Sequence, residues 1–338
     1  MTSKIDLNEY RGVWVFVEQT EGRPARVSLE LLGKGRELSD KLGVELTAFL
    51  LGASVQNMAK ELIFYGADEV IVADHPLFEE YLTELYTGII SEQAINRKPE
   101  VLIIGATPIG RDLAPRLSFK LKAGCTADCT NLDIDQENRL LISTRPAFGG
   151  NVMATIICPK NRPQMSTVRP GVMPLPEKDK KRKGRVRDLD VHLIKENVRV
   201  EVVESIKSTH DNVKIEEAER IVAVGMGACD NEALAMAKEL AELLGAQLGF
   251  SRLAVEAGWS SHDCQIGQTG KTVRPEVYVA CGISGAVQHT AGMSESKMII
   301  AINKDPNAEI FNIADYGIVG DVKKLFPAII NELKSLKA

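Results

Sequence analysis

Long apolar stretches are missing from this 338-residue chain. No uninterrupted run approaches the roughly 20 apolar residues that a membrane helix needs, so we expect no insertion into a membrane. The first ten residues, MTSKIDLNEY, lack the apolar core of a signal peptide and the arginine-rich pattern of a transit peptide. The default expectation is therefore a cytoplasmic protein.

An excess of positive charge is also lacking. The formal net charge is −5 and the isoelectric point is near 5.7, which argues against general affinity for nucleic acid phosphates. Cysteines are few and scattered. Cys125 and Cys129 form one CxxxC pair, but no second pair or histidine cluster completes a metal set. We expect reduced thiols and neither a metal site nor an iron–sulfur cluster.

Short apolar runs alternate with helical patterns through the first hundred residues, and the length of the chain suggests two domains. Strands are predicted over 13–17, 46–51, 69–73 and 101–104, and helices over 28–42, 55–65 and 79–94. Strands separated by single helices predict right-handed crossovers and a parallel sheet, so the first domain is expected to be an open α/β unit. Three further strands, over 140–145, 152–158 and 164–169, are predicted to form an antiparallel extension or an edge of it.

Several cations of this first domain allow two interpretations. Arg145, Arg162 and Arg169 each stand beside a proline that restricts the local backbone. They could be held for an anion or carboxylate partner, or they could serve intrachain ion pairs or subunit packing. The loop at 105–111 follows a predicted strand, where Gly105 and Thr107 could line a site and Arg111 could equally be a surface cation. The basic run at 178–187 is typical of a solvated linker or surface turn, with docking of an acidic protein as the alternative.

A strand is predicted over 198–204, and the polar segment at 207–213 is predicted to be the domain boundary and a hinge. The N-terminal domain is therefore assigned to residues 1–207 and the C-terminal domain to residues 208–338. A second α/β pattern follows, with strands over 220–225, 247–250, 277–281, 298–302 and 315–319 and helices over 231–244 and 321–336. Asp321 is suited to the N-cap of the last helix.

The stretch from Gln265 to Asn303 is the chemical centre of the second domain. Its segment Gly282-Ile-Ser-Gly-Ala-Val-Gln-His289 leaves a predicted strand and enters a predicted helix. Small residues allow a ligand to approach the backbone, and free N–H groups attract anions. Upstream, Gly267-Gln-Thr-Gly-Lys271 supplies amide, hydroxyl and ammonium groups. These two loops favour a cofactor that carries both phosphates and a polar ring.

The same residues carry a family resemblance. The segment 278–289, with Gly292 and Ala301-Ile-Asn303, resembles the signature of the electron-transfer flavoprotein alpha subunit, and the similarity continues through 251–258, 267–270 and 314–321. It implies two α/β domains with mainly parallel sheets. The N-terminal domain would be similar to the adenine-nucleotide hydrolases, and the C-terminal one would be a Rossmann-like domain that binds FAD. It also implies a heterodimer with a beta subunit, relaying electrons in fatty acid metabolism to or from an acyl-CoA dehydrogenase or a quinone oxidoreductase.

The resemblance also implies which residues bind FAD, whereas electron relay requires no catalytic acid or base. Arg252 is expected against the isoalloxazine ring, His289 at the pyrimidine carbonyl, and Thr269 or Gln268 near N5. Ser251, Ser284 and the amides around Gly285 are expected at phosphate or ribitol oxygens, and Asn303 and Asp321 at the adenosine end. The complete expected set is Ser251, Arg252, Gln265, Ile266, Gly267, Gln268, Thr269, Gly270, Ser284, Gly285, Ala286, Val287, Gln288, His289, Asn303, Asp321 and Val322.

Three questions stay open at this point. The segments 145–151 and 161–165 are similar to those of anaerobic, electron-bifurcating members, in which a second FAD in the beta subunit takes hydride from NADH and the complex also serves ferredoxin. Met226 stands where the family usually has an arginine that meets the diphosphate, a loss for which backbone N–H groups or Lys271 could compensate. Gly225 and Gly227 form part of a dinucleotide fingerprint, but Asp230 stands in place of its third glycine. Two alternative functions remain. The glycines allow a self-contained NAD-dependent dehydrogenase, and the alternating pattern of the first domain allows a non-redox protein that binds adenine nucleotides.

Overall fold

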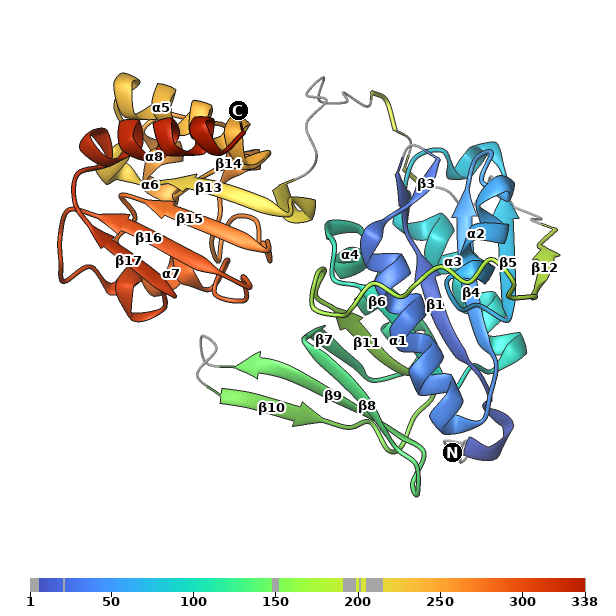
Figure 1. Cartoon of the computed structure of the whole chain (residues 1–338). Coiled ribbons are helices and arrows are strands. Elements are labelled where there is room, and N and C mark those ends of the chain that lie inside the picture. The colour runs from blue at the N-terminus through green and yellow to red at the C-terminus, as the bar shows by residue number, and fades with distance from the viewer. Residues whose placement is uncertain are drawn as a thin grey trace. The chain divides into compact units, whose positions relative to one another are not determined.

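The computed structural model describes residues 6–20, 22–147, 152–190, 199–200, 202–204 and 215–337. The chain divides into two compact units, residues 1–207 and residues 208–338, which are considered one at a time (Figure 1). The segment 207–213, which we expect to act as a hinge, lies outside the described residues.

The N-terminal unit is built on a seven-stranded sheet in the order β12-β5-β4-β1-β6-β11-β7, and every neighbouring pair is parallel. Its strands are β1 (Val13–Val17), β4 (Leu46–Gly52), β5 (Glu69–Asp74), β6 (Val101–Gly105), β7 (Cys125–Cys129), β11 (Gln164–Val168) and β12 (Arg185–Asp188). Strands that are buried on both faces need apolar side chains at consecutive positions, which is why β1, β4 and β6 were predictable from their apolar runs.

Successive side chains of β1 point to opposite faces of this sheet. Val13, Val15 and Val17 enter the core beneath α1 (Arg26–Leu42) and α2 (Ala59–Phe64), whereas Trp14 and Phe16 enter the core beneath α3 (Thr83–Arg97) and α4 (Pro108–Leu121). A three-stranded antiparallel sheet of β8 (Asn131–Asp135), β9 (Leu140–Ala147) and β10 (Val152–Ile156) adds Leu132, Ile134 and Leu141 to the first of these cores. A short hairpin joins β2 (Gln19–Thr20) to β3 (Arg23–Pro24).

The structure corrects the predicted antiparallel extension. Residues 164–168 form β11, which lies in the parallel sheet between β6 and β7. Strand β11 is buried although it carries polar side chains, which made its place in the parallel sheet difficult to predict. These side chains have partners inside the protein. The hydroxyls of Ser166 and Ser143 are 2.7 Å apart, and the Gln164 side chain accepts from the Leu141 amide at 2.8 Å. The remaining strand of the extension, β8, was not predicted.

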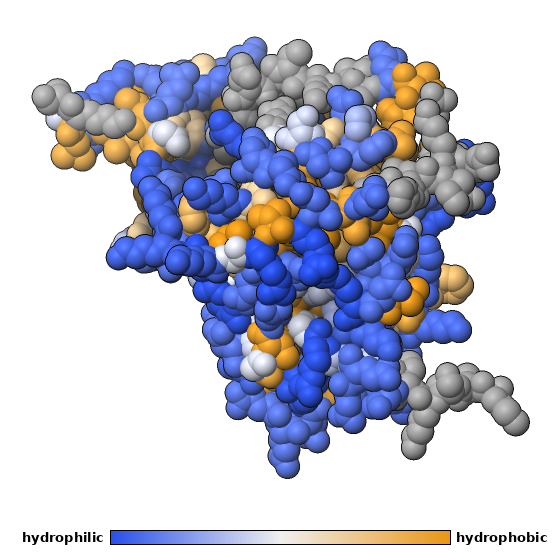
Figure 2. All heavy atoms as spheres, turned by 90° about the vertical axis from the view of Figure 1, so that its right-hand side faces the viewer, coloured by the Kyte–Doolittle hydropathy of each residue, from blue (hydrophilic) through white to orange (hydrophobic). Residues whose placement is uncertain are grey.

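The basic run at 178–187 is partly a strand, so the prediction of a linker or surface turn is wrong for its last residues. Arg185–Asp188 form β12, the edge strand beside β5. Arg182 pairs with Asp68 at 2.6 Å and Arg187 with Glu69 at 3.0 Å. Figure 2, which views the side of the molecule where β12 lies in Figure 1, shows a mainly hydrophilic face. The predicted strand at 198–204 is absent from its described residues, 199–200 and 202–204, which have no regular structure.

The C-terminal unit contains a five-stranded parallel sheet in the order β14-β13-β15-β16-β17. Its strands are β13 (Arg220–Val224), β14 (Gln247–Phe250), β15 (Val277–Cys281), β16 (Ile299–Asn303) and β17 (Tyr316–Val319). The helices α5 (Asn231–Leu244) and α8 (Val322–Lys337) pack together on one face (Figure 1). The two predicted α/β domains with mainly parallel sheets are confirmed.

The opposite face of this second sheet is covered mostly by loops and short helices. Ile266, Met293 and Ile310 pack there against Tyr278 and Ala223 of the sheet. The short helices of the unit include α6 (Arg252–Glu256), α7 (Val287–Thr290) and the 3-10 segments η6 (Ile215–Glu217) and η9 (Glu309–Asn312). Among the described residues, no helix combines the length and apolar character needed to cross a membrane.

Candidate cofactor site

The order of the second sheet reverses between β13 and β15, and at such a point the carboxyl ends of parallel strands leave a crevice for ligands. The backbones meet closely there. The Gly225 amide donates to the Cys281 carbonyl at 2.8 Å, and the Gly227 amide donates to the Gly282 carbonyl at 3.1 Å. A β-carbon on Gly225 would lie 2.4 Å from the Gly282 oxygen. Glycine is therefore required at this junction by packing, whether or not a dinucleotide binds.

The loop after β15 offers free backbone donors. Gly285 has a φ of +95°, and a β-carbon on it would lie 2.0 Å from the backbone nitrogen of Ile310. The Ile310 amide donates to the Ser284 carbonyl at 3.0 Å, which fixes the loop against η9. Within the described residues, the amides of Ser284, Gly285 and Ala286 donate to no protein acceptor. Such amides are suited to phosphate oxygens, although α7 is only four residues long and adds little as a helix.

A second loop, residues 265–271, lies against the first. The Gln268 amide donates to the Gln288 carbonyl at 2.7 Å, and a β-carbon on Gly267 would lie 2.7 Å from that same oxygen. The Gln265 side-chain amide donates to the Thr269 hydroxyl oxygen at 3.1 Å. Because Thr269 is exposed and its oxygen already accepts this bond, its hydroxyl proton remains to be donated outward.

The two cations predicted for this site have acidic partners that the sequence did not indicate. Arg252 is the first residue of α6, and its Nε lies 2.7 Å from Glu256 Oε1 in an exposed pair one helical turn apart. Lys271 Nζ lies 2.8 Å from Glu216 Oε1. Lys271 is thus engaged within the protein, which weakens the expectation that it replaces the missing arginine at position 226.

His289 is buried, with 7% of its surface exposed. Its Nε2 lies 2.9 Å from the hydroxyl oxygen of Tyr278, a fully buried residue of β15. No atom among the described residues meets hydrogen-bond geometry at the buried Nδ1. Burial lowers the pKa of His289 to about 4, and the backbone of Ile266 opposes that shift. The ring is therefore neutral near pH 7 and has one unsatisfied nitrogen, which fits a site that is completed by a ligand.

The residues expected at the adenosine end lie at the carboxyl ends of β16 and β17. The Asn303 side chain donates to the Ile283 carbonyl at 2.8 Å and accepts from the Asp305 amide at 3.0 Å, so both of its polar atoms already support loops. Asp321 is exposed, and its Oδ1 accepts from the Lys323 amide at 2.9 Å, as the predicted N-cap of α8 would. Val322 is buried in the hydrophobic core and can reach a ligand only through its backbone.

A continuous series of contacts joins the predicted residues from Ser251 to Asp321. The Ile266 amide donates to the Phe250 carbonyl, the loop at 265–271 contacts α7, and the Gly320 amide donates to the Asn303 carbonyl. Exposure divides the set. The exposed members are Arg252, Gln268, Thr269, Ser284, Ala286, Val287, Gln288 and Asp321; the half-buried members are Ser251, Gly270 and Asn303; the buried members are Gln265, Ile266, Gly267, Gly285, His289 and Val322.

Asp230 argues against a dinucleotide diphosphate at the start of α5. Its carboxylate accepts from the amides of Glu232 and Ala233 at 3.1 Å and 3.0 Å, and Lys323 pairs with it at 3.0 Å. The side chain thus occupies the helix N-terminus where a fingerprint glycine would leave room for phosphate. Met226, in the preceding loop, is 47% exposed and brings no charge.

The arginines of the N-terminal unit are mostly satisfied within the chain. Arg162 donates to backbone carbonyls of Arg139, Cys158 and Asn161, and Arg169 pairs with Asp128 at 2.7 Å. Both geometries favour the intrachain alternative. Arg145 Nε is buried without a partner among the described residues.

The loop residue Thr107 caps α4 and also donates to Glu18 Oε2 at 2.5 Å, so its hydroxyl is used within the protein.

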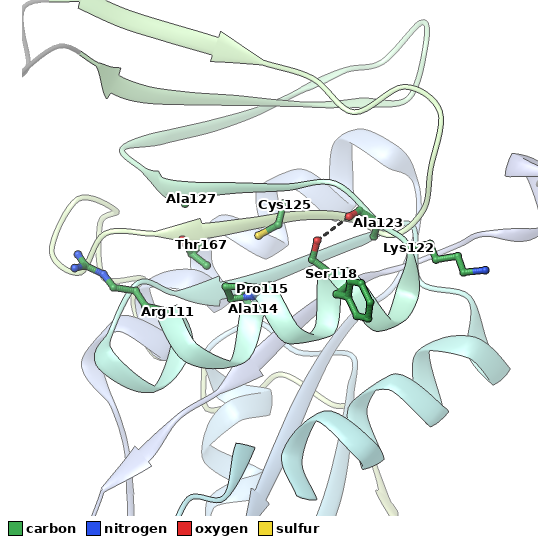
Figure 3. Close-up of a pocket in the computed structure, with 10 residues that line it drawn as sticks. Arg111, Ala114, Pro115, Ser118, Lys122, Ala123, Cys125, Ala127 and Thr167 are labelled. Carbon is green, nitrogen blue, oxygen red and sulfur yellow. Dashed lines mark hydrogen bonds between the residues drawn. The ribbon is translucent and has the colours of Figure 1, made fainter. Parts of the chain in front are cut away.

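A cavity of about 660 Å³ lies between α4 and β7 of the N-terminal unit (Figure 3). Arg111 and Lys122 stand at opposite ends of it, and Ala114, Pro115 and Cys125 lie between them. The polar groups of its wall are used internally: the Ser118 hydroxyl donates to the Ala123 carbonyl, and the Thr167 hydroxyl accepts from the Asp128 amide. None of the predicted cofactor residues lines this cavity, so it is not part of the candidate cofactor site.

The described part of the chain contains no group of three metal-binding side chains.

Comparisons with known proteins identify the family of the chain. A family model described as an electron transfer flavoprotein domain matches residues 13–194, and one described as an electron transfer flavoprotein FAD-binding domain matches residues 214–294. An electron transfer flavoprotein subunit alpha from Thermoanaerobacterium thermosaccharolyticum is 53% identical, covering 98% of this chain and 100% of the relative.

Two more relatives are named for the reactions that they serve. The acryloyl-CoA reductase electron transfer subunit beta of Anaerotignum propionicum is 46% identical, covering 98% of both chains. The lactate dehydrogenase (NAD(+),ferredoxin) subunit LctC of Acetobacterium woodii is 42% identical, covering 98% of this chain and 78% of the relative.

Proposed function

The chain belongs to the electron transfer flavoprotein family as an alpha subunit, and we propose that the carboxyl edge of its C-terminal sheet forms the FAD site. Bound there, FAD would supply the redox chemistry, and the protein would supply binding, orientation and electrostatics. The observation that carries this assignment is the joined pair of loops at 265–271 and 282–289, with three free amides, an outward hydroxyl and the unsatisfied Nδ1 of His289.

Each polar group has a role that follows from its chemistry. The amides of Ser284, Gly285 and Ala286 would hold phosphate oxygens, a task for which fixed N–H dipoles cost little reorganisation. Thr269 would donate to a ring nitrogen, and His289 would donate from Nδ1 to a ring carbonyl. Arg252 would favour negative charge on the ring, an effect that strengthens where water is excluded.

The remaining predicted residues would shape the pocket rather than donate to the cofactor. Gly267 and Gly270 pack tightly against Gln288 and Gln265 and leave no room for side chains, which brings the two loops together. Asn303 would act chiefly by holding the Ile283 carbonyl and the turn at Asp305. Asp321 has one carboxylate oxygen left after its contact with Lys323, and this oxygen would accept from a ribose hydroxyl.

Alpha subunits of this family form heterodimers with a beta subunit. We propose that the redox partner of this heterodimer is an acyl-CoA dehydrogenase or a related flavoenzyme, in line with the name of the relative from Anaerotignum propionicum. The name of the relative from Acetobacterium woodii, which includes NAD(+) and ferredoxin, supports a bifurcating version. In that version a second FAD in the beta subunit takes hydride from NADH and passes electrons to two acceptors.

One preparation tests both the proposed FAD site and the bifurcating version. The chain is produced together with its beta subunit, and the flavins and AMP per heterodimer are counted before NADH is added. Two FADs with reduction by NADH support the bifurcating version, whereas one FAD with AMP supports a simple carrier. A heterodimer without FAD would contradict the site itself.

A variant series then tests the location of the site. Replacing Ser284 by proline removes one of the free amides, whereas Ser284→Ala keeps the amide and removes only the hydroxyl. If the amides bind phosphate, the proline variant loses FAD and the alanine variant retains most of it. Equal FAD content in both variants, with unchanged circular dichroism, would place the phosphates elsewhere.

A further inference from the structure

Tyr278 lies in the middle of the C-terminal core and is fully buried. Its hydroxyl has one hydrogen-bond partner among the described residues, Nε2 of His289, at 2.9 Å. A buried hydroxyl seldom lacks a partner, and burying one without a partner costs free energy. The bond therefore links strand β15 to the short helix α7 and fixes the imidazole on one side.

The direction of this bond determines which ring nitrogen carries the proton. A neutral imidazole has one N–H donor and one bare acceptor. If Nε2 donated to Tyr278, the tyrosine hydroxyl proton would be buried without an acceptor among the described residues, because Nε2 is the one partner of that hydroxyl there. If Tyr278 donates instead, its proton has an acceptor, and the neutral ring carries its own proton on Nδ1.

We propose that Tyr278 is a positioning residue: its hydroxyl donates to Nε2 of His289 and so holds the imidazole as the tautomer with its proton on Nδ1. The part of this inference that concerns FAD rests on the proposed function, because only a cofactor in the proposed site would accept the hydrogen bond from Nδ1. The arrangement resembles the way in which a second residue orients a functional histidine in other sites. It allows a neutral histidine to act as a fixed donor across the neutral pH range.

Nitrogen NMR on the heterodimer with ¹⁵N-labelled histidine tests the tautomer directly. The chain has five histidines, and a His289→Asn variant identifies the signals of His289. In the wild type, the spectrum is expected to show a protonated Nδ1 and a bare Nε2 from pH 6 to pH 8. In Tyr278→Phe, which keeps the ring and removes the hydroxyl, these signals are expected to shift toward a mixture of the two tautomers.

Tyr86→Phe is the matched control, because Tyr86 is also a buried tyrosine with a hydroxyl bonded inside the protein, to the Phe78 carbonyl at 3.2 Å. It should lower the thermal stability without changing the His289 signals. A wild-type ring protonated on Nε2, or unchanged His289 signals in Tyr278→Phe, would overturn the proposal.

The flavin potential of the same variants separates this inference from the proposed site. A mixed tautomer together with a shifted potential supports both. A mixed tautomer with an unchanged potential would uphold the positioning role of Tyr278 and overturn the contact between His289 and FAD. Folding of the C-terminal unit in Tyr278→Phe is checked by circular dichroism. If that variant does not fold, the wild-type spectrum decides alone, since a ring protonated on Nε2 overturns the proposal without any variant.

Discussion

Arg252 and Glu256 form an ion pair one helical turn apart on α6, with Nε and Oε1 separated by 2.7 Å. Their side chains are 63% and 51% exposed, so the pair contributes little to stability. The pair matters instead for the positive charge that Arg252 can offer to a bound flavin. A guanidinium that faces both a carboxylate and a flavin stabilises negative charge on the flavin less than a free guanidinium would.

Replacing Glu256 by glutamine is therefore expected to raise the redox potential of the bound FAD. The glutamine keeps the size of the side chain and removes its charge, so the positive charge of Arg252 is no longer offset. The rise is expected to be small, because both side chains are mostly exposed and solvent screens charges at such positions. Spectroelectrochemistry of the heterodimer measures it, and Arg252→Ala should shift the potential in the opposite direction.

Asp40→Asn is the matched control for this change. Asp40 pairs with Arg36 at 2.8 Å in another i,i+4 arrangement, in α1 of the N-terminal unit. Its removal should leave the potential unchanged while costing a similar small amount of stability. Equal shifts in both variants would mean that the effect is one of net charge and not of the Arg252 site.

Sequence patterns predicted the strands of the C-terminal sheet well because their runs are apolar and end at glycine or polar residues. Strand β14 (Gln247–Phe250) and strand β15 (Val277–Cys281) have the predicted ends. Polar side chains led to wrong predictions for two strands of the N-terminal unit. Strand β11 carries buried serine and glutamine whose partners come from β9, and β12 is an edge strand of charged residues that pair with glutamates of other elements.

The predicted site residues were selected by resemblance, and the partners of their side chains could not be predicted in the same way. Glu216 reaches Lys271 across 55 positions, and Tyr278 reaches His289 across 11 positions. Such contacts depend on the packing of a strand against a loop. The pattern at Asp230 did contain a usable signal, since an acidic residue before a helical run is typical of an N-cap, which fits its contacts with the first turn of α5.

Gly285→Ala is expected to abolish FAD binding and to destabilise the C-terminal unit. Its φ is +95°, and a β-carbon would lie 2.0 Å from the Ile310 nitrogen, so backbone strain and a steric clash combine at roughly 3 kcal/mol or more. Gly258→Ala is the control, because Gly258 also has a positive φ, +82°, with no atom within 4 Å of the added carbon. That variant should lose only about 1 kcal/mol and retain FAD. Flavin content and thermal unfolding measure both effects, and retention of FAD by Gly285→Ala would contradict the assigned loop.

Glu100→Gln is expected to destabilise the N-terminal unit without loss of FAD. Glu100 is 2% exposed and receives two bonds from Arg139, at 2.9 Å and 2.6 Å. Removing the charge weakens two charge-assisted hydrogen bonds of a buried carboxylate, at a cost of about 1–3 kcal/mol, since the Arg139 side chain is 34% exposed. Glu45→Gln, at the exposed pair with Arg185, should cost less than about 1 kcal/mol. Denaturant unfolding followed through Trp14 in a Trp259→Phe background reports on this unit, and similar losses in both variants would refute the role of burial.

The buried, neutral His289 predicts a specific pH dependence of stability. Its pKa in the folded chain is about 4, below the ordinary value of 6.5, so between these values the unfolded chain binds a proton that the folded chain does not. Stability therefore falls as the pH is lowered from 6.5 to 4 and levels off below the folded pKa. The pKa difference corresponds to a loss of about 3 kcal/mol.

Because carboxylates also titrate in this range, the test is the difference between the wild type and His289→Gln, which cannot be protonated. Unfolding free energies of the C-terminal unit, followed through Trp259 fluorescence in a Trp14→Phe background, should converge for the two chains as the pH falls from 7 to 4. His262→Gln is the control for the loss of a histidine as such, because His262 is exposed. Parallel profiles for wild type and His289→Gln would mean that the pKa of His289 is the same in the folded and unfolded chains, so that the folded ring also becomes protonated as the pH falls. Tyr278 would then have to accept the hydrogen bond from Nε2.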